Sequence, residues 1–237
     1  MVLIPSDADT PQCFLDLYNP SYFPSISALN KSRKPASQLI SKPSILLIAQ
    51  PDESMPNKLK EMKVVQATDM QVTTLFSSKA TPHAVLKHLR DHPFAHIVSH
   101  GILEPGKPFE ASFKFHEERS LLLLDIVQSR LPNAEFAFLS ASHTAELTDE
   151  SIADEVIHLS AAMLFCGFRS VVGAMWAMAD IDGPDLAKDF YDSVFLKETG
   201  QPYYERTAKA LRDAVVKLRR KGGISLERWV NFVHFGA

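Results

Sequence analysis

The fold is indicated first by residues 44–50, Ser44-Ile-Leu-Leu-Ile-Ala-Gln50, an apolar run that lies between Pro43 and Pro51. A short, continuous apolar run of this kind is expected for a strand that is buried on both faces of a parallel sheet. Further strands are predicted at residues 72–76, 94–99, 134–140 and 169–176, and a hairpin at residues 111–115 and 120–124. We therefore expect the first run to be a central strand of a larger sheet.

Helical patterns lie between these strands. The clearest begins at Thr81-Pro82, where an N-capping residue precedes a proline at the first helical position, and Val85 and Leu89 form its apolar stripe. Helices are predicted over residues 52–62, 81–92, 125–130, 151–166, 183–196, 203–221 and 226–233. Strands that alternate with helices of this length predict one α/β domain with a mainly parallel sheet.

The composition of the chain argues against several classes of protein. Its 237 residues are 46% hydrophobic and 22% charged, which is ordinary for a globular protein and not for a coiled coil, a fibre or a disordered chain. The net charge of −3 does not favour nucleic acid or an anionic membrane as a partner. The start, Met1–Asp7, carries no targeting signal, and no window approaches the roughly 18 apolar residues of a membrane span. We expect a soluble cytoplasmic protein.

Cysteine and histidine usage does not favour a disulfide or a metal site. The two cysteines, Cys13 and Cys166, lie far apart, whereas a disulfide framework or a structural zinc site would show more cysteines at closer spacing. His88 and His92 have the one-turn spacing of a zinc-binding pair, but no Glu or Cys completes a known ligand set. We expect free thiols, no metal and no cofactor.

Polar residues of a catalytic type follow two of the predicted strands. Ligands bind at the carboxyl ends of strands in sheets of this kind. His100-Gly101 follows one strand, with Gly101 expected to turn the backbone sharply, and Ser140-Ala-Ser-His-Thr144 covers the end of the next. If the two strands are neighbours, His100 and the side chain at position 142 enter one cleft as a general base and a nucleophile would. A turn histidine and a loop or capping serine remain the alternative explanation.

Several segments, taken in order along the chain, resemble one known family. They are His96-Ile-Val-Ser-His100-Gly101, Leu139-Ser-Ala-Ser-His-Thr144, Ala153-Asp-Glu155, Gly167-Phe-Arg-Ser-Val-Val-Gly173, Trp176 with Asp180, Phe190-Tyr191 and Trp229-Val-Asn-Phe232. Their wording closely resembles the CHAT domain, a family of caspase-like and separase-like cysteine peptidases of clan CD, and residues 131–176 look most like the fungal members. The resemblance covers residues 21–237 as a single peptidase-like domain, with residues 1–20 as an N-terminal lead-in segment.

The resemblance implies a caspase-like three-layer α/β/α sandwich with a dyad of one histidine and one cysteine. The histidine is His100, and the nucleophile position is Ser142, where serine stands in place of the family's cysteine. A thiol beside a histidine forms a thiolate readily because its pKa is about 8.5 and falls further beside a positive group. A serine hydroxyl is far less acidic and needs a well-oriented base. We therefore expect a cysteine endopeptidase domain with weak activity or none in this form.

Three explanations of Ser142 remain open. The serine is an exchange made to trap an inactive peptidase, the mark of a natural pseudo-peptidase, or the nucleophile of a working serine variant. Cys13 and Cys166 do not replace the missing thiol, since the first lies in the lead-in segment and the second on the apolar face of a helix. The alternative function is a protein-binding or signalling module. A serine esterase is less favoured because no Gly-x-Ser-x-Gly segment occurs.

The resemblance also implies roles for residues around the dyad. The backbone amides of Gly101 and Ser142 are candidates for binding the oxyanion. Asp180 and Asp182 match an acidic segment that in separases contributes to a pocket for a basic residue, although Asp182 is as well suited to capping the next helix. His143 is expected at the cleft rim, in contact with substrate. The expected partners are a protein or peptide substrate, extended along a strand edge, and a regulatory domain or partner chain.

Overall fold

The computed structural model centres on one mainly parallel sheet. It describes residues 3–4, 12–33, 44–50, 56–102, 110–115, 120–129, 131–143, 159–160, 162–176, 178–195 and 203–237. The strands of the main path are β3 (Ser44–Ala49), β4 (Gln71–Phe76), β5 (Phe94–Ile102), β8 (Phe136–His143), β9 (Ser170–Ala174) and β10 (Phe232–Gly236). Their spatial order is β10-β9-β8-β5-β3-β4, and every neighbouring pair is parallel except β9 and β10. The prediction of a mainly parallel α/β sheet is confirmed, but β3 is an inner strand next to the last strand of this order and not the middle of the sheet.

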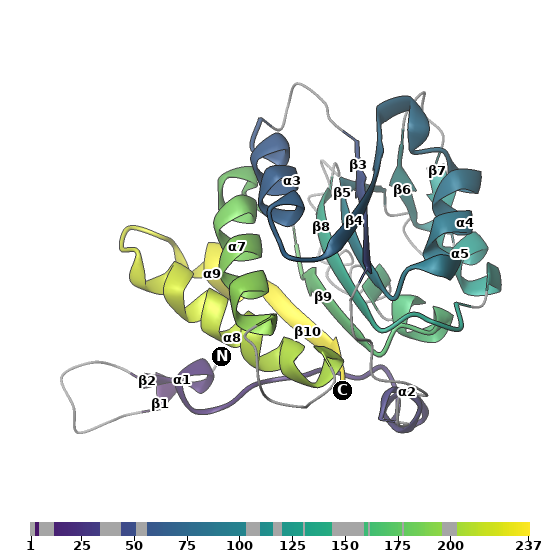
Figure 1. The fold of residues 1–237 in the computed structure, drawn as a ribbon. Helices are drawn as coiled ribbons and strands as arrows, with labels where there is room; N and C mark the ends of the chain where they lie inside the picture. The colour runs from purple at the N-terminus through teal and green to yellow at the C-terminus, as the bar shows by residue number, and fades with distance from the viewer. Residues whose placement is uncertain are drawn as a thin grey trace.

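Helices cover both faces of this sheet (Figure 1). One face carries α4 (Pro82–Asp91) and α5 (Leu123–Ser129), and the other carries α3 (Lys58–Gln66), α7 (Gly183–Val194), α8 (Tyr203–Arg220) and α9 (Leu226–Val230). Alternate residues of β5 supply both cores, because successive side chains of a strand point to opposite faces. Ala95 and Ile97 pack in the α4 core, while Phe94 and Val98 pack in the α7 core. The result is a three-layer α/β/α arrangement.

Helix α4 begins as its sequence predicts. The Thr81 side chain accepts a hydrogen bond from the backbone N–H of Ala84 at 3.2 Å, and Pro82 is the first helical residue. The helix ends at Asp91, with His92 as its C-cap directly before Pro93, and it buries Val85 and Leu89. The capping residue therefore satisfies one of the backbone donors that a helix start leaves unpaired.

Strands β5 and β8 both extend beyond their predicted ends, and a short hairpin pairs with the extension of β5. The predicted turn at Gly101 is wrong, because β5 continues to Ile102 and Gly101 lies inside it. The hairpin strands β6 (Ser112–Lys114) and β7 (Ser120–Leu122) were predicted, and β6 pairs with the last three residues of β5. Strand β8 likewise continues to His143 instead of ending at residue 140. Polar residues at the ends of both strands are thus held in the sheet.

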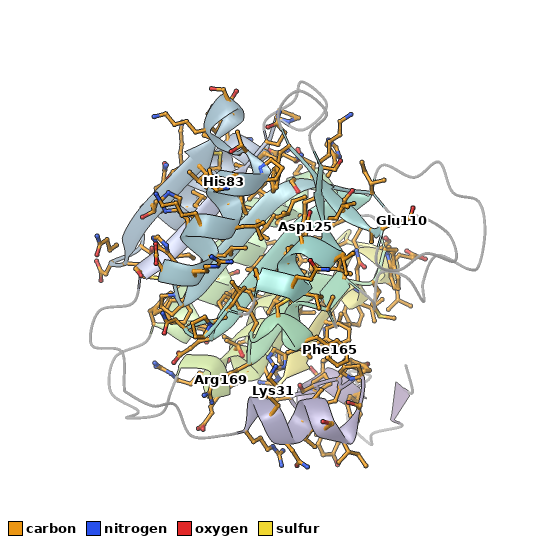
Figure 2. The ribbon with its side chains drawn as sticks, turned by 90° about the vertical axis from the view of Figure 1, so that its right-hand side faces the viewer. Lys31, His83, Glu110, Asp125, Phe165 and Arg169 are labelled. Carbon is orange, nitrogen blue, oxygen red and sulfur yellow. The ribbon has the colours of Figure 1, made fainter. Side chains whose placement is uncertain are left out.

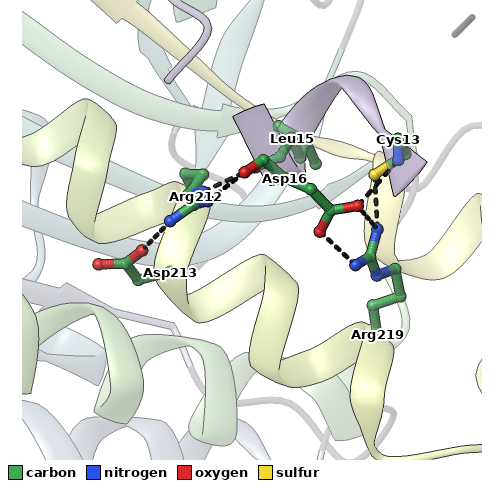
Figure 3. Close-up of polar contacts among 6 residues, drawn as sticks. All are labelled: Cys13, Leu15, Asp16, Arg212, Asp213 and Arg219. Atoms are coloured by element: carbon green, nitrogen blue, oxygen red, sulfur yellow. Dashed lines mark hydrogen bonds and ion pairs between the residues drawn. The ribbon is translucent and has the colours of Figure 1, made fainter. Parts of the chain in front are cut away.

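The described N-terminal residues pack against α8 and β10. Short strands β1 (Leu3–Ile4) and β2 (Gln12–Cys13) pair, and helices α1 (Phe14–Leu17) and α2 (Ile26–Ser32) follow. On α8, Arg212 donates to the backbone oxygens of Leu15 and Asp16, and Arg219 forms an ion pair with the Asp16 carboxylate (Figure 3). These bonds tie the first helix to the last long one.

Figure 2 views the molecule from the right-hand side of Figure 1 and shows Lys31 on α2 beside Phe165 and Arg169. The Lys31 ammonium donates to the Phe165 carbonyl oxygen at 3.2 Å, next to the end of the helical residues 162–166. A cation near a helix C-terminus interacts favourably with the helix dipole. Of the helix predicted at residues 151–166, residues 151–158 and 161 lie outside the described residues, and the remainder is helical.

Candidate functional site

His100 and Ser142 lie directly opposite each other on neighbouring parallel strands. In the register between β5 and β8, His100 pairs with Ser142, and Gly101 pairs with His143. Paired backbones in a sheet are about 4.8 Å apart, so the two positions predicted as base and nucleophile are neighbours. His100 is 6% exposed and lies at the carboxyl end of the sheet. The sequence placed the two residues in one cleft only if their strands are neighbours, and β5 and β8 are neighbours.

The two positions belong to the face of the sheet that α3 and α7 cover. His96 and His100 are four residues apart on β5, and Ser140 and Ser142 are two apart on β8, so strand alternation assigns each pair of positions to one face. His96 and Ser140 contact residues of α3 and α7, which identifies that face. The candidate site thus lies above a buried polar cluster.

That cluster contains four side chains linked by hydrogen bonds. The Ser140 hydroxyl donates to Glu61 Oε2 at 2.9 Å, and His96 Nε2 lies 3.1 Å from Glu61 Oε1. The other ring nitrogen of His96, Nδ1, lies 2.8 Å from the Tyr191 hydroxyl. Each of the four side chains is almost completely buried, and the His96 ring stacks on Phe138 with centroids 4.8 Å apart.

Sequence reasoning missed Glu61 and assigned His96 no role. Of the helix predicted at residues 52–62, residues 52–55 lie outside the described residues, and α3 covers Lys58–Gln66. An acidic residue on a helix is usually solvated. A signal did exist at His96, because it interrupts the apolar run from Phe94 to Val98. A polar residue inside a buried strand needs a hydrogen-bonding partner.

Gly101 lies between two strands, with Phe113 of β6 on one side and His143 of β8 on the other. The sequence had suggested a turn at Gly101, but the residue is extended within β5. The proposed use of the Gly101 and Ser142 amides for an oxyanion stays a prediction. So does the role of His143 in contacting substrate.

Asp180 and Asp182 lie on the short helix η4 (Asp180–Asp182), between β9 and α7, and both carboxylates have partners. Asp180 accepts hydrogen bonds from the backbone and side-chain nitrogens of Asn57, each at 2.9 Å. Asp182 accepts from Arg228 Nε at 2.8 Å and from a terminal guanidinium nitrogen at 2.5 Å. Asp182 is the residue before α7, but its side chain makes no capping hydrogen bond. A role of either in binding substrate stays a prediction.

Both cysteines are buried free thiols. Cys166 donates to the Ala162 carbonyl oxygen at 2.9 Å, and burial raises the pKa of its thiol to about 12. The expectation that Cys166 is a buried core residue is confirmed. Within the described ranges, no three His, Cys, Asp or Glu side chains gather as metal ligands would. None of the helices in those ranges is long and apolar enough to cross a membrane.

Known structures share this fold. Gingipain R (RgpB) of Porphyromonas gingivalis, described as an Arg-specific cysteine proteinase, superposes with a TM-score of 0.55 at 9% identity, over 81% of this chain and 46% of that one. Separase, in its complex with securin from Saccharomyces cerevisiae, gives a TM-score of 0.57 at 16% identity, over 91% of this chain and 14% of that one. This chain therefore spans about half of the first and a small part of the second. No curated protein matches it in sequence.

The family comparison covers nearly the whole chain. The model of the CHAT domain matches residues 5–237, which include most of the predicted lead-in segment. A domain boundary at residue 20 stays a prediction. The match agrees with the mainly parallel sheet and with the pairing of positions 100 and 142. This chain is a member of the CHAT-domain family.

Proposed function

We propose that this chain is a peptidase domain of the cysteine type, whose base is His100 and whose nucleophile position is 142, and that Ser142 leaves it with little or no activity. The observation that carries the proposal is the direct pairing of His100 with Ser142 across β5 and β8. The substrate is a peptide bond of a protein. Gingipain R is described as an Arg-specific cysteine proteinase, which supports peptide hydrolysis as the reaction class of this fold.

With cysteine at position 142, the reaction balances in two steps. The thiolate attacks the peptide carbonyl carbon, the peptide C–N bond breaks, and protonated His100 gives its proton to the leaving amine. Water then attacks the thioester, His100 removes a proton from that water, and the thiolate leaves with the acid as product. With serine, the hydroxyl proton must first pass to His100 during attack, which raises the barrier.

The experiment compares the present chain, Ser142→Cys, and Ser142→Cys with His100→Ala on a peptide library that varies the residue before the cut. We expect turnover only in Ser142→Cys, and a loss of at least 100-fold when His100→Ala is added. Thermal unfolding of all three forms checks that they fold. No cleavage by Ser142→Cys across the library would overturn the proposal, and turnover by the present chain would establish a serine nucleophile.

The second candidate is a pseudo-peptidase that binds a protein without cutting it. The observation that favours it is Ser142 itself, and a silent Ser142→Cys form that still binds a partner would select it.

The separase structure contains securin, and by analogy we propose a regulatory domain or partner chain for this domain too. A fungal origin and a cytoplasmic location also belong to this proposal. A preference for a basic residue requires Asp180 or Asp182 to exchange its present partner for substrate.

A further inference from the structure

The Glu61 carboxylate lies at the centre of the hydrogen bonds in this cluster. Burial, and then the negative charge of Glu61, raise the pKa of Tyr191 well above its usual value, so its hydroxyl keeps its proton. His96 Nδ1 lies 2.8 Å from that hydroxyl. His96 Nε2 lies 3.1 Å from Glu61 Oε1, and Glu61 Oε2 accepts from the Ser140 hydroxyl.

The cluster joins four elements directly below the candidate dyad. Glu61 comes from α3, His96 from β5, Tyr191 from α7 and Ser140 from β8. Ser140 precedes position 142 by two residues, about 7 Å along a strand. Ser140 also pairs with Val98 in the register that places Ser142 opposite His100. The Glu61 carboxylate is thus bonded to the strand that carries the nucleophile position.

We propose that Glu61 is a positioning residue for the dyad, which holds β8 through Ser140 and supplies a fixed negative charge that favours the protonated imidazole of His100. The inference rests on the proposed function, because it assigns Glu61 a part in the same site. Glu61 acts through its neighbours, since the hydrogen bonds of its carboxylate described above go to His96 and Ser140.

The charge has a definite effect on a dyad with cysteine at position 142. Each of the two groups loses a proton when it ionises, the thiol to give a thiolate and the imidazolium to give an imidazole. A nearby negative charge raises both pKa values, so removal of the Glu61 charge lowers both. A fixed carboxylate near a dyad in partly buried surroundings shifts such a group by about one pH unit. Loss of geometry alone acts in the opposite direction, because a thiol that is not held beside His100 returns toward a pKa of about 8.5.

Other charged groups face the same region, and they are the same with and without the substitution Glu61→Gln. Lys58 lies one turn before Glu61 on α3 and is buried. On η4, Asp180 is bonded to Asn57, and Asp182 is paired with Arg228. Substitution of Glu61 by glutamine changes none of these. The amide also offers an oxygen that accepts and a nitrogen that donates to the same two partners, His96 and Ser140.

The test measures the pH dependence of alkylation by iodoacetamide of the thiol introduced by Ser142→Cys, which requires no substrate. In that background, we expect Glu61→Gln to lower the thiol pKa by about one unit. Ser140→Ala is expected to raise it toward about 8.5. The matched control is Thr207→Val, in the buried cluster around His234 and away from the site, and it is expected to leave the thiol pKa unchanged.

Failure of this inference differs from failure of the proposed function. If His100→Ala does not change the thiol pKa of the Ser142→Cys form, the dyad itself is absent. If His100→Ala raises that pKa but Glu61→Gln leaves it unchanged or raises it, the dyad stands and the role of Glu61 is overturned. Should Glu61→Gln not fold, Ser140→Ala still decides the positioning part, since an unchanged thiol pKa in that variant would contradict it.

Discussion

His100 on β5 and Ser142 on β8 are register partners, so the backbone hydrogen bonds of two parallel strands determine how far apart the candidate base and nucleophile lie. Strand β5 is paired with β6 as well as β8 at this point, which restrains His100 from both sides. A site of this kind depends on the integrity of the sheet. The contacts that hold the sheet and its helices therefore bear on the site and can be tested.

Cys166 is expected to resist alkylation as long as the chain is folded. Its thiol is buried and its pKa is raised to about 12 by burial, so at pH 8 only about one molecule in 10⁴ carries the thiolate. Iodoacetamide treatment followed by peptide mass spectrometry, with and without urea, measures this. We expect label at Cys166 only in urea. Labelling of native Cys166 as fast as that of the thiol introduced by Ser142→Cys would contradict the prediction.

Gly183→Ala is expected to destabilise the fold by about 1–3 kcal/mol. A Cβ at this position would lie 2.7 Å from Glu61 Oε2 and 3.0 Å from Met178 Cε, too close for both. Urea unfolding gives the loss, and the matched background is Glu61→Asp, whose shorter side chain withdraws from the contact. The alanine should cost less in that background. Equal losses in the two backgrounds would show that Glu61 is not the obstacle.

Asp182→Asn is expected to cost about 2–3 kcal/mol of unfolding free energy. The Asp182 carboxylate is 4% exposed and is paired with Arg228 by two hydrogen bonds, and removal of one partner leaves a partly buried charge without compensation. Asp192→Asn is the control, because the Lys188–Asp192 pair is exposed and should contribute little to stability. Denaturant midpoints that move equally for both variants would refute the expectation.

Acid should weaken the fold through His234. Its ring is bonded to Ser21, Ser170 and Thr207, and burial lowers its pKa from 6.5 to about 3. Protonation favours the unfolded chain, whose histidine keeps a pKa near 6.5, so this contribution is complete above pH 6.5 and is lost as pH falls toward 3. His234→Gln should flatten urea midpoints in that window and lower them at pH 7. An unchanged pH slope in the variant would rule this out.

The elements predicted correctly are those whose pattern is local. The strand within residues 44–50 and the capped helix after Thr81 could be predicted, because a buried strand and a helix start each have a typical pattern of neighbouring residues. The missed strand β10, with Phe232 paired to Ala174, follows directly on a short helix and depends on a partner far away in sequence. Such pairing has no local signature.

The candidate site shows the same division. The family resemblance identified positions 100 and 142, and the register brings them together. The extension of β5 through Gly101 was not predictable, because glycine favours turns and only the pairing with β6 keeps it extended. Glu61 was missed because its partners Ser140 and His96 lie 79 and 35 residues away.

The unequal lengths of the two ladders on β8 have a consequence for the direction from which a substrate approaches. Strand β8 is paired with β5 over eight residues, from Phe136 to His143, but with β9 only over Phe136 to Phe138. One side of the strand's last residues is therefore filled by β5, and the ladder with β9 does not reach them. A peptide that pairs with the last residues of β8 is therefore expected to arrive from the β9 side.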